Sequence, residues 1–403
     1  MSDHGFGMRD VMNIDEVRRN LRRDLDQLRA PEGYLFAGSP RYRTLFGRDS
    51  LISAWQTLSI DPTIAKATLQ VLARYQGGRF DARSEEEPGK ILHEHRFDIE
   101  SRNELPNWDF PYYGSIDSTL LYLIVAGEYA QRTGDRPLID ELWGTIEAAY
   151  RWMTQYGDKD GDGFLEYERA NPHGLLHQGW KDGFDDHILV RPPVAIIEVQ
   201  GYAVAAHRAY AALAEPRGEP IVGKRALAAA SALQKALNRT FWMGDQHFYA
   251  LALDGAKRLR TAITSNPAHL LLMDAVPRKR VQRIVARLFQ PDMWTPYGLR
   301  THATSEPDFV PGSYQIGSIW PHDNWFFARG LLKQGLEDEA KQVVQALLMA
   351  YEEMGRMPEC YAVDGGTLVD ISTSSRNDVR ANPLQAWASG ALLDLVSDRR
   401  LMA

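Results

Sequence analysis

Long stretches that carry almost no charge alternate along this chain with amphipathic stretches, and this alternation constrains the fold more than any other feature. Residues 116–130 are nearly uncharged, whereas apolar side chains recur every three or four positions through residues 138–153. This spacing predicts helices in both stretches. A helix without charge is buried on all sides, while an amphipathic helix buries one face, so we predict an inner and an outer layer of helices.

The same pairing recurs along the chain, and the helices at its two ends complete it. Helices at 14–28 and 384–396 would pair with each other to close a ring of twelve. We therefore predict an all-α (α/α)6 toroid, a six-hairpin barrel, formed as a single domain by residues 1–403, with residues 1–35 supplying the N-terminal helix that closes the ring. An open solenoid is the alternative, but its repeats are shorter and more uniform. The five predicted hairpins span 48–73, 116–153, 194–242, 266–289 and 319–351.

Composition and charge exclude several classes of partner. The chain has 403 residues and a net charge of -7, without a run of Lys or Arg, so we expect neither nucleic acid nor a membrane surface as a partner. No stretch approaches the roughly 18–20 apolar residues of a membrane span, and the first residues lack the pattern of a secretory leader. The single cysteine, Cys360, suits a reducing compartment. We expect a cytoplasmic protein without a cofactor, and no pattern specifies its oligomeric state.

The segments that precede the predicted inner helices carry the candidate site. A closed toroid leaves a pocket where its inner helices begin, so these segments should converge there. They are rich in aromatic, carboxylate and amide side chains, which predicts a polar pocket with stacking platforms for a sugar. Singly, Asp49 could cap its helix, Trp320 could lie in the core, and His322 could be a satisfied buried histidine. The segments are 46–49, 111–117, 178–186, 264–266, 317–324 and 357–361.

Several of these segments match a known group of enzymes. The chain resembles the glucosidase domain of bacterial amylo-α-1,6-glucosidases and glycogen-debranching-type enzymes, within the wider six-hairpin glycosidases that include glucoamylases, trehalases and neutral invertases. The likeness runs from about residue 35 to the C-terminus. Its motifs include Gln-Gly-Trp-Lys-Asp at 178–182 and Gly-Ser-Ile-Trp-Pro-His-Asp-Asn at 317–324, with further matches at 45–54, 87–94, 112–117, 160–167, 198–202 and 385–387.

The resemblance implies hydrolysis of a terminal α-linked glucose with inversion, in which two carboxyl groups act. It assigns the general acid to Asp182, in the loop before the third inner helix, and the general base to Glu359, before the last helix. Inverting enzymes hold these groups roughly 6.5–9.5 Å apart, on opposite faces of the sugar. Closure of the ring would bring the two residues together. Asp185 and Asp186 are rivals for the acid, but their spacing from Trp180 does not fit the motif.

The same resemblance implies the residues that hold the sugar. Arg48 and Asp49 would bind hydroxyl groups at the pocket floor. Lys181, a further candidate for binding, would be expected to lower the pKa of Asp182, so the acid role would also need burial to raise it. The candidate stacking faces are Tyr113, Trp180 and Trp320, and the candidate hydroxyl partners are His93, Glu94, Asp117, His322 and Asp323.

Two further features are interpreted without a catalytic role. Asp158, Asp160 and Asp162 resemble the start of a calcium loop, but Arg169 stands where a bidentate Glu is needed. We therefore favour a turn over a calcium site, and the sequence alone does not decide whether these residues bind calcium. Cys360 lies beside the proposed base without a thiol partner, which makes it an improbable nucleophile.

The substrate and two other classes of function stay open. Debranching-type relatives usually carry a β-rich domain before the barrel, where this chain has only about forty residues, and residues 360–366 are closer to invertase-type members. A short α-glucoside is therefore as plausible as a dextrin. A sugar 2-epimerase of the N-acylglucosamine type would use histidines as acid and base, for which His93, His177 and His322 are available. A glycan-binding barrel without catalysis is the other alternative, although it would be expected to lack one carboxylate.

Overall fold

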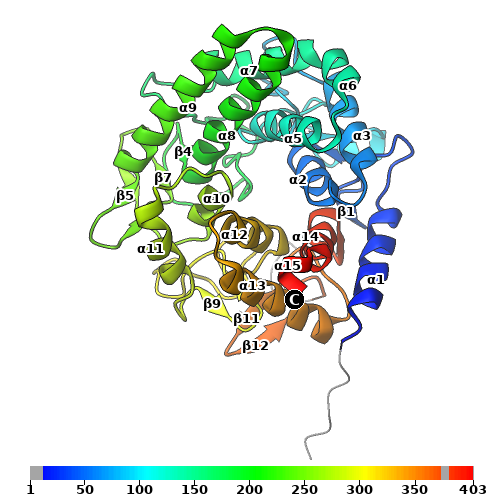
Figure 1. Cartoon of the computed structure of the whole chain (residues 1–403), viewed down its shortest axis with the longest axis vertical. Helices are drawn as coiled ribbons and strands as arrows, with labels where there is room; N and C mark the ends of the chain where they lie inside the picture. The colour runs from blue at the N-terminus through cyan, green and yellow to red at the C-terminus, as the bar shows by residue number, and fades with distance from the viewer. Residues whose placement is uncertain (1–11, 374–380, 403) are drawn as a thin grey trace, which may run out of the picture.

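The computed structural model describes residues 12–373 and 381–402, and the first eleven residues, where no leader pattern was expected, lie outside this part. Within it, six helices form an inner ring in which each packs against the next and the last packs against the first (Figure 1). The predicted toroid is therefore confirmed. The inner helices are α2 (Gly47–Thr57), α5 (Ser118–Thr133), α8 (Ile197–Ala214), α10 (Asn266–Leu272), α12 (Pro321–Lys333) and α14 (Ala386–Ser397).

Each inner helix has an outer helix packed on it, and the difference in sequence between the layers explains the arrangement. In α5 every residue from Ser118 to Ala126 is buried, whereas α1 buries Val17, Leu21 and Leu25 on one face. The outer helices are α1 (Ile14–Gln27), α3 (Pro62–Arg74), α7 (Trp143–Gln155), α9 (Pro220–Thr240), α11 (Arg278–Leu288) and α13 (Glu337–Met354).

Short elements that the periodicity did not predict fill the connections. The predicted helix over 138–153 is divided at Leu142 into α6 (Arg136–Glu141) and α7. The other short helices are α4 (Ile99–Asn103), the 3-10 turn η1 (Glu215–Arg217) and α15 (Arg399–Met402). Antiparallel strands of two or three residues lie in the loops: β1 (Gly38–Ser39), β2 (Leu45–Phe46), β3 (Glu94–His95), β4 (Ala195–Ile196), β5 (Trp242–Met243), β6 (Phe248–Tyr249), β7 (Ala252–Leu253), β8 (Leu259–Arg260), β9 (Trp294–Thr295), β10 (Gly298–Leu299), β11 (Ala362–Asp364), β12 (Thr367–Val369) and β13 (Leu384–Gln385).

The first and last elements meet at a seam. Helix α1 packs on α14, and the Nε atom of Arg18 donates to the carbonyl of Val396 at 3.0 Å. Strand β1 pairs with β13, with Gly38 opposite Gln385. A Cβ atom at Gly38 would lie 2.9 Å from the carbonyl oxygen of Leu384, so the close approach of the strands requires glycine there.

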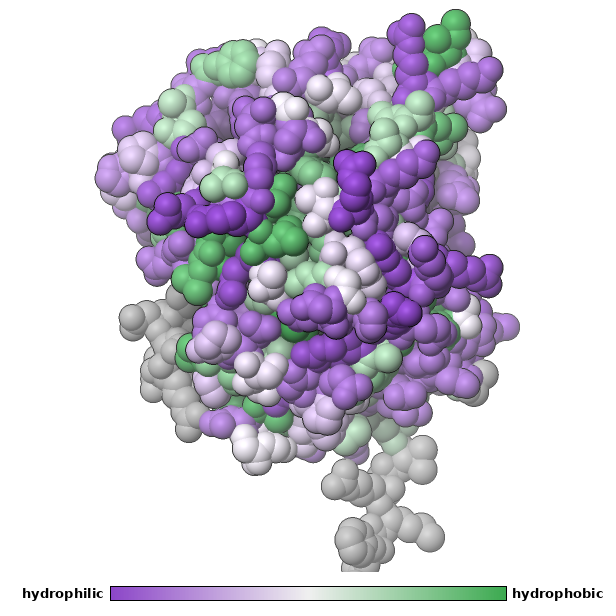
Figure 2. All heavy atoms as spheres, turned by 90° about the vertical axis from the view of Figure 1, so that its left-hand side faces the viewer, coloured by the Kyte–Doolittle hydropathy of each residue, from purple (hydrophilic) through white to green (hydrophobic). Residues whose placement is uncertain are grey.

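Hydrophilic side chains cover most of the face of the molecule that Figure 2 shows, with apolar residues in small groups between them. Among the described residues, no helix combines the length and the apolar character needed to cross a bilayer.

Candidate active site

A cavity of about 410 Å³ lies where the inner helices begin. Most of the predicted site residues line it, and they come from regions that lie far apart in the sequence. These are Arg48, Asp49, His93, Glu94, Trp180, Asp182, Trp320 and Glu359. Closure of the ring therefore brings the two candidate catalytic carboxyls into one cavity.

Local structure explains how the first four of these residues reach the cavity. Arg48 and Asp49 lie in the first turn of α2, where the helix dipole favours a carboxylate. Strand β2, directly before α2, pairs with β3, and Phe46 lies opposite Glu94. A Cβ atom at Gly47 would meet the carbonyl oxygen of Leu92 at 2.0 Å, so only glycine permits this approach.

Asp182 is held by an arginine at the cavity floor. Its Oδ2 atom accepts a hydrogen bond from Nη1 of Arg48 at 2.9 Å, and Nε2 of His93 lies 4.0 Å from the same oxygen. The Nε atom of Arg48 donates to Asp117 at 2.7 Å, so one guanidinium joins two carboxylates. Burial raises the pKa of Asp182, and Arg48 opposes that rise. Because its side chain keeps 27% exposure, the carboxyl remains accessible from the cavity.

Lys181 does not act as the sequence suggested. Its ammonium is buried on the other side of the loop, where it donates to the carbonyl of Thr301 at 2.7 Å and lies 5.0 Å from the ring centroid of Trp180. It does not line the cavity. The expectation that Lys181 lowers the pKa of Asp182 is therefore wrong, because Arg48 is the cation that does so. The two neighbouring side chains leave the loop in different directions, Lys181 toward Thr301 and Asp182 toward Arg48.

Glu359 occupies a buried position with a donor on each oxygen. The hydroxyl of Tyr314 donates to Oε1 at 2.7 Å, and the backbone N–H of Asn382 donates to Oε2 at 2.8 Å. Burial raises the pKa of Glu359 to about 7, and the negative charge of Asp182 adds to the rise. A carboxyl with such a pKa can exchange a proton near neutral pH.

Two further buried carboxyls line the cavity. Burial raises the pKa of Asp49 to about 8 and that of Glu94 to about 7. Asp49 accepts a hydrogen bond from the side chain of Gln385 at 3.1 Å, and Glu94 pairs with Arg96 at 2.5 Å. Both groups can exchange hydrogen bonds with sugar hydroxyls.

Aromatic rings form the walls, and several of them were not predicted. Trp180 and Trp320 lie edge to face with ring centroids 5.8 Å apart. Trp108, which lines the cavity, stacks on Tyr112, which does not, and their ring centroids lie 3.6 Å apart. The motif at 385–387 carries a tryptophan for which the sequence indicated no role, whereas the loops at 42, 108 and 314 carried no signal. The aromatic residues of the lining for which the sequence indicated no individual role are Tyr42, Phe46, Trp108, Phe184, Tyr314 and Trp387, and of these Phe46 and Phe184 lie in the predicted segments 46–49 and 178–186.

Four other predicted residues do not line the cavity, and their side chains contact other parts of the protein instead. Tyr113 is buried and donates to the carbonyl of Tyr75 at 2.7 Å, so its ring offers no stacking face here. Asp117 accepts a hydrogen bond from Nε of Arg48 and so fixes the position of the guanidinium. The ring of His322 stacks on Trp387 with centroids 3.9 Å apart. Asp323 pairs with His269 at 2.7 Å in the barrel interior.

The rival acids are less enclosed than Asp182. Asp185 lies at the rim and Asp186 outside the lining, and both are exposed. Asp186 pairs with Nε2 of His177 at 3.1 Å, and the other ring nitrogen of that histidine bonds the hydroxyl of Tyr167. These contacts indicate a structural role for the Asp186 carboxylate.

The predicted turn at 158–163 surrounds a lysine. The carboxyl oxygens of Asp158, Asp160, Asp162 and Glu166 lie within 4.8 Å of one another. The ammonium of Lys257 pairs with three of these side chains, those of Asp160, Asp162 and Glu166, and lies 3.1 Å from the last. The lysine thus supplies a positive charge to this acidic turn.

Comparisons with known proteins agree on one group. A family model described as the mannosylglycerate hydrolase MGH1-like glycoside hydrolase domain matches residues 42–374. The chain is 30% identical over 196 residues to a mannosylglycerate hydrolase from Rubrobacter radiotolerans, and this match covers 47% of the chain and 41% of that relative, less than half of its length.

Solved structures share the fold. The chain is similar to the GH63 mannosylglycerate hydrolase from Thermus thermophilus in complex with Tris, with a TM-score of 0.71 and 17% identity over 94% of this chain and 99% of that one. A rhamnosidase from Klebsiella oxytoca with rhamnose bound gives a TM-score of 0.63 and 16% identity, over 97% and 64% of the two chains. At these identities the likeness concerns the fold alone.

Proposed function

This chain belongs to the mannosylglycerate hydrolase MGH1-like glycoside hydrolase family, and on that premise we propose that it hydrolyses a short α-glycoside with inversion, using Asp182 as general acid and Glu359 as general base. The observation that carries the proposal is the presence of these two carboxyls in a single cavity with aromatic walls, each with a pKa raised by burial.

The proposed chemistry follows from the surroundings of each carboxyl. Asp182 gives its proton to the glycosidic oxygen as the bond to the sugar breaks, and its raised pKa keeps that proton available. Glu359 takes a proton from a water molecule that attacks the anomeric carbon from the opposite face. Tyr314 and the Asn382 N–H hold the base in one orientation. Arg48 orients Asp182 and stabilises its carboxylate after proton transfer.

The size of the cavity supports a small substrate. A volume of about 410 Å³ lies at the lower end of the range for small-molecule sites, which favours one sugar with a short aglycone over a branched glucan. The relatives are named for mannosylglycerate, so we propose a mannoside of glycerate as the first candidate. The motifs that resemble amylo-α-1,6-glucosidases keep a terminal α-glucoside as the second candidate, and a cytoplasmic location stays a prediction.

The positions of the histidines weigh against the epimerase alternative. Of the three candidates, His93 lines the cavity, whereas His177 and His322 do not. Burial lowers the pKa of His93 well below its usual range, so this imidazole stays neutral. His187 also lines the cavity, but its ring nitrogens lie 3.1 and 3.0 Å from the backbone carbonyls of Asp185 and Lys181, and burial lowers its pKa as well.

Proton NMR of the anomer formed in the first minutes tests the proposal. The protein is incubated with mannosylglycerate, glucosylglycerate and maltotriose, and the Asp182→Asn and Glu359→Gln variants are run in parallel. We expect β-mannose first from mannosylglycerate, and loss of release in both variants. Asp185→Asn is the matched control for removal of a nearby carboxylate and should retain activity. Initial α-anomer, or activity in either catalytic variant, would overturn the assignment.

The pH profile supplies a second readout. Because the base must be ionised, kcat/KM should fall as the pH drops through about 7, the pKa of Glu359. Isomerisation of a free sugar without hydrolysis would support the epimerase instead.

A further inference from the structure

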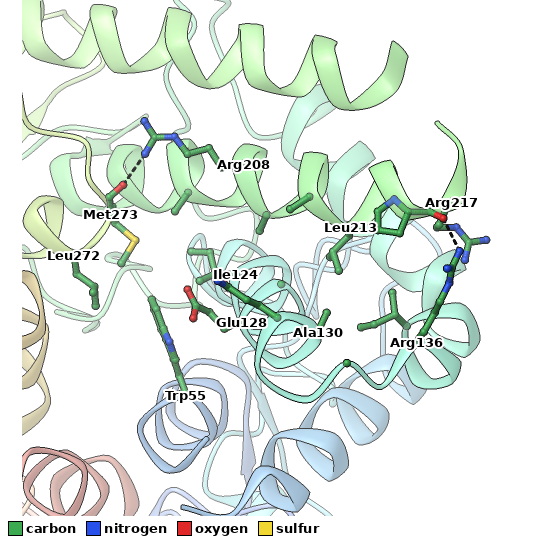
Figure 3. Close-up of a pocket in the computed structure, with 18 of the residues that line it drawn as sticks. Trp55, Ile124, Glu128, Ala130, Arg136, Arg208, Leu213, Arg217, Leu272 and Met273 are labelled. Carbon is green, nitrogen blue, oxygen red and sulfur yellow. Dashed lines mark hydrogen bonds between the residues drawn. The ribbon is translucent and has the colours of Figure 1, made fainter. Parts of the chain in front are cut away.

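A second cavity, of about 620 Å³, lies at the opposite end of the inner helices, where α2, α5, α8, α10 and α12 end (Figure 3). None of its lining residues belongs to the catalytic cavity. Apolar side chains form much of the wall, including Trp55, Ile124, Leu213, Leu272 and Met273. The volume and the apolar wall are those of a site for a small organic molecule.

The cations that line this cavity are already occupied by the protein. Arg208 donates to the carbonyls of Met273 and Asp274, at 3.0 and 3.2 Å. The guanidinium of Arg136 donates to the carbonyl of Pro216, as Figure 3 shows, and Arg217 pairs with Asp140. Carbonyls at the ends of helices carry partial negative charge and attract such donors. Little capacity remains in these arginines for an anionic ligand.

Glu128 differs from the other charged residues of the lining. Among the described residues, none donates a hydrogen bond to its carboxylate or forms an ion pair with it within 4 Å. Figure 3 shows the carboxylate directed toward the space between Trp55 and Met273. Burial raises the pKa of Glu128, while Lys333 opposes that rise from a distance. The ammonium of Lys333 donates instead to the carbonyl of Leu272 at 2.8 Å.

We propose that this second cavity binds a small amphiphilic organic cation, with its ammonium group on Glu128 and its apolar body against Trp55, Leu272 and Met273. The carboxylate supplies the counter-charge, and the face of the tryptophan attracts a cation within about 6 Å of its ring. The partial negative charge of the five helix ends offsets the arginines and the lysine of the lining, which leaves Glu128 as the unpaired carboxylate. The shape, the apolar surface and this carboxylate together favour a cation with an apolar body.

Calorimetry with three probes of similar shape tests the proposal. These are benzyltrimethylammonium, its neutral isostere neopentylbenzene, and the anion phenylacetate. We expect the cation to bind at least tenfold more tightly than the other two. Glu128→Gln and Trp55→Leu should each weaken its binding about tenfold, whereas Glu352→Gln, which removes an exposed carboxylate on α13, should leave binding unchanged.

The catalytic cavity also contains carboxylates and tryptophans, so it needs its own control. Binding of the cation should persist in Asp182→Asn and in the presence of excess mannose. No binding of the cation, equal binding of the anion, or full binding to Glu128→Gln would overturn the proposal. Loss of binding in Asp182→Asn alone would place the cation in the catalytic cavity and would equally overturn it.

Discussion

The two ends of the inner ring hold cavities of opposite character. Where the helices begin, buried carboxyls gather, including Asp49 in the first turn of α2, Glu198 in the first turn of α8 and Asp323 in the first turn of α12. Where the helices end, arginines and a lysine donate to backbone carbonyls, and the walls are apolar. The larger cavity is thus the one without the chemistry expected of a hydrolase.

The direction of the helices explains this difference. Each helix carries about half a positive charge at its N-terminus and half a negative charge at its C-terminus. Because six inner helices begin at one end, carboxylates can be buried there at lower cost, and cations are drawn to the other end. The polarity of the ring therefore decides which end can hold a pair of catalytic carboxyls.

The largest expected effect comes from the proposed general acid. Asp182→Asn should lower kcat/KM by about 10³ or more, because removal of a positioned acid typically costs 10²–10⁴. Steady-state kinetics with mannosylglycerate measure it, with circular dichroism to verify that the variant is folded. Glu352→Gln should leave kcat/KM within twofold. If the Asp182→Asn enzyme kept near-normal activity, catalysis could no longer be assigned to the carboxyls at the end where the inner helices begin.

Arg48→Met should destabilise the fold by about 3 kcal/mol, since it leaves Asp117 and Asp182 without their buried counter-charge. Urea unfolding near neutral pH measures the change. A loss below about 1 kcal/mol would show that the two carboxyls are protonated or hydrated without the arginine.

Removal of the proposed base should stabilise the protein at high pH. The pKa of Glu359 rises from its usual 4.5 to about 7 on folding, so ionisation costs the folded state stability as the pH rises from about 4.5 to 7. Glu359→Gln escapes this cost. It should be about 3 kcal/mol more stable than the natural protein at pH 8, and the gain should vanish near pH 4.5. Thermal unfolding of both proteins between pH 4.5 and 8 measures this gain in stability. A gain that is independent of pH would contradict the raised pKa of Glu359.

The smallest effect is expected at the second cavity. Arg208→Gln removes donors from the carbonyls of Met273 and Asp274, but water can replace them at this accessible end. We expect a loss of about 1 kcal/mol in urea unfolding and unchanged kcat/KM. A loss as large as that of Arg48→Met would remove the energetic contrast between the two ends.

The fold could be predicted from the sequence because the two layers differ in local charge pattern. The uncharged stretch at 116–130 and the amphipathic one at 14–28 became α5 and α1, with boundaries shifted by a few residues. The break at Leu142 was not predicted, since the apolar stripe continues across it.

The site was predicted less completely, for two physical reasons. Trp108, Tyr42 and Tyr314 lie in loops whose contacts exist only once the ring is closed, so no local pattern marks them. Lys181 and Asp182 are neighbours in sequence yet reach opposite sides of one loop. The roles of Asp182 and Glu359 in catalysis rest on the resemblance and stay predictions.

The seam between the first and last elements has a consequence for biosynthesis. The wall of the catalytic cavity includes Asp49, which Gln385 contacts, and Glu359, whose oxygen the Asn382 N–H binds. During translation, the chain that has already left the ribosome holds α2 and its arginine long before α14 exists. The nascent chain must therefore remain an open ring with an incomplete pocket until α14 emerges. Any product that terminates before α14 should lack the complete pocket, which couples the synthesis of this helix to the appearance of the proposed activity.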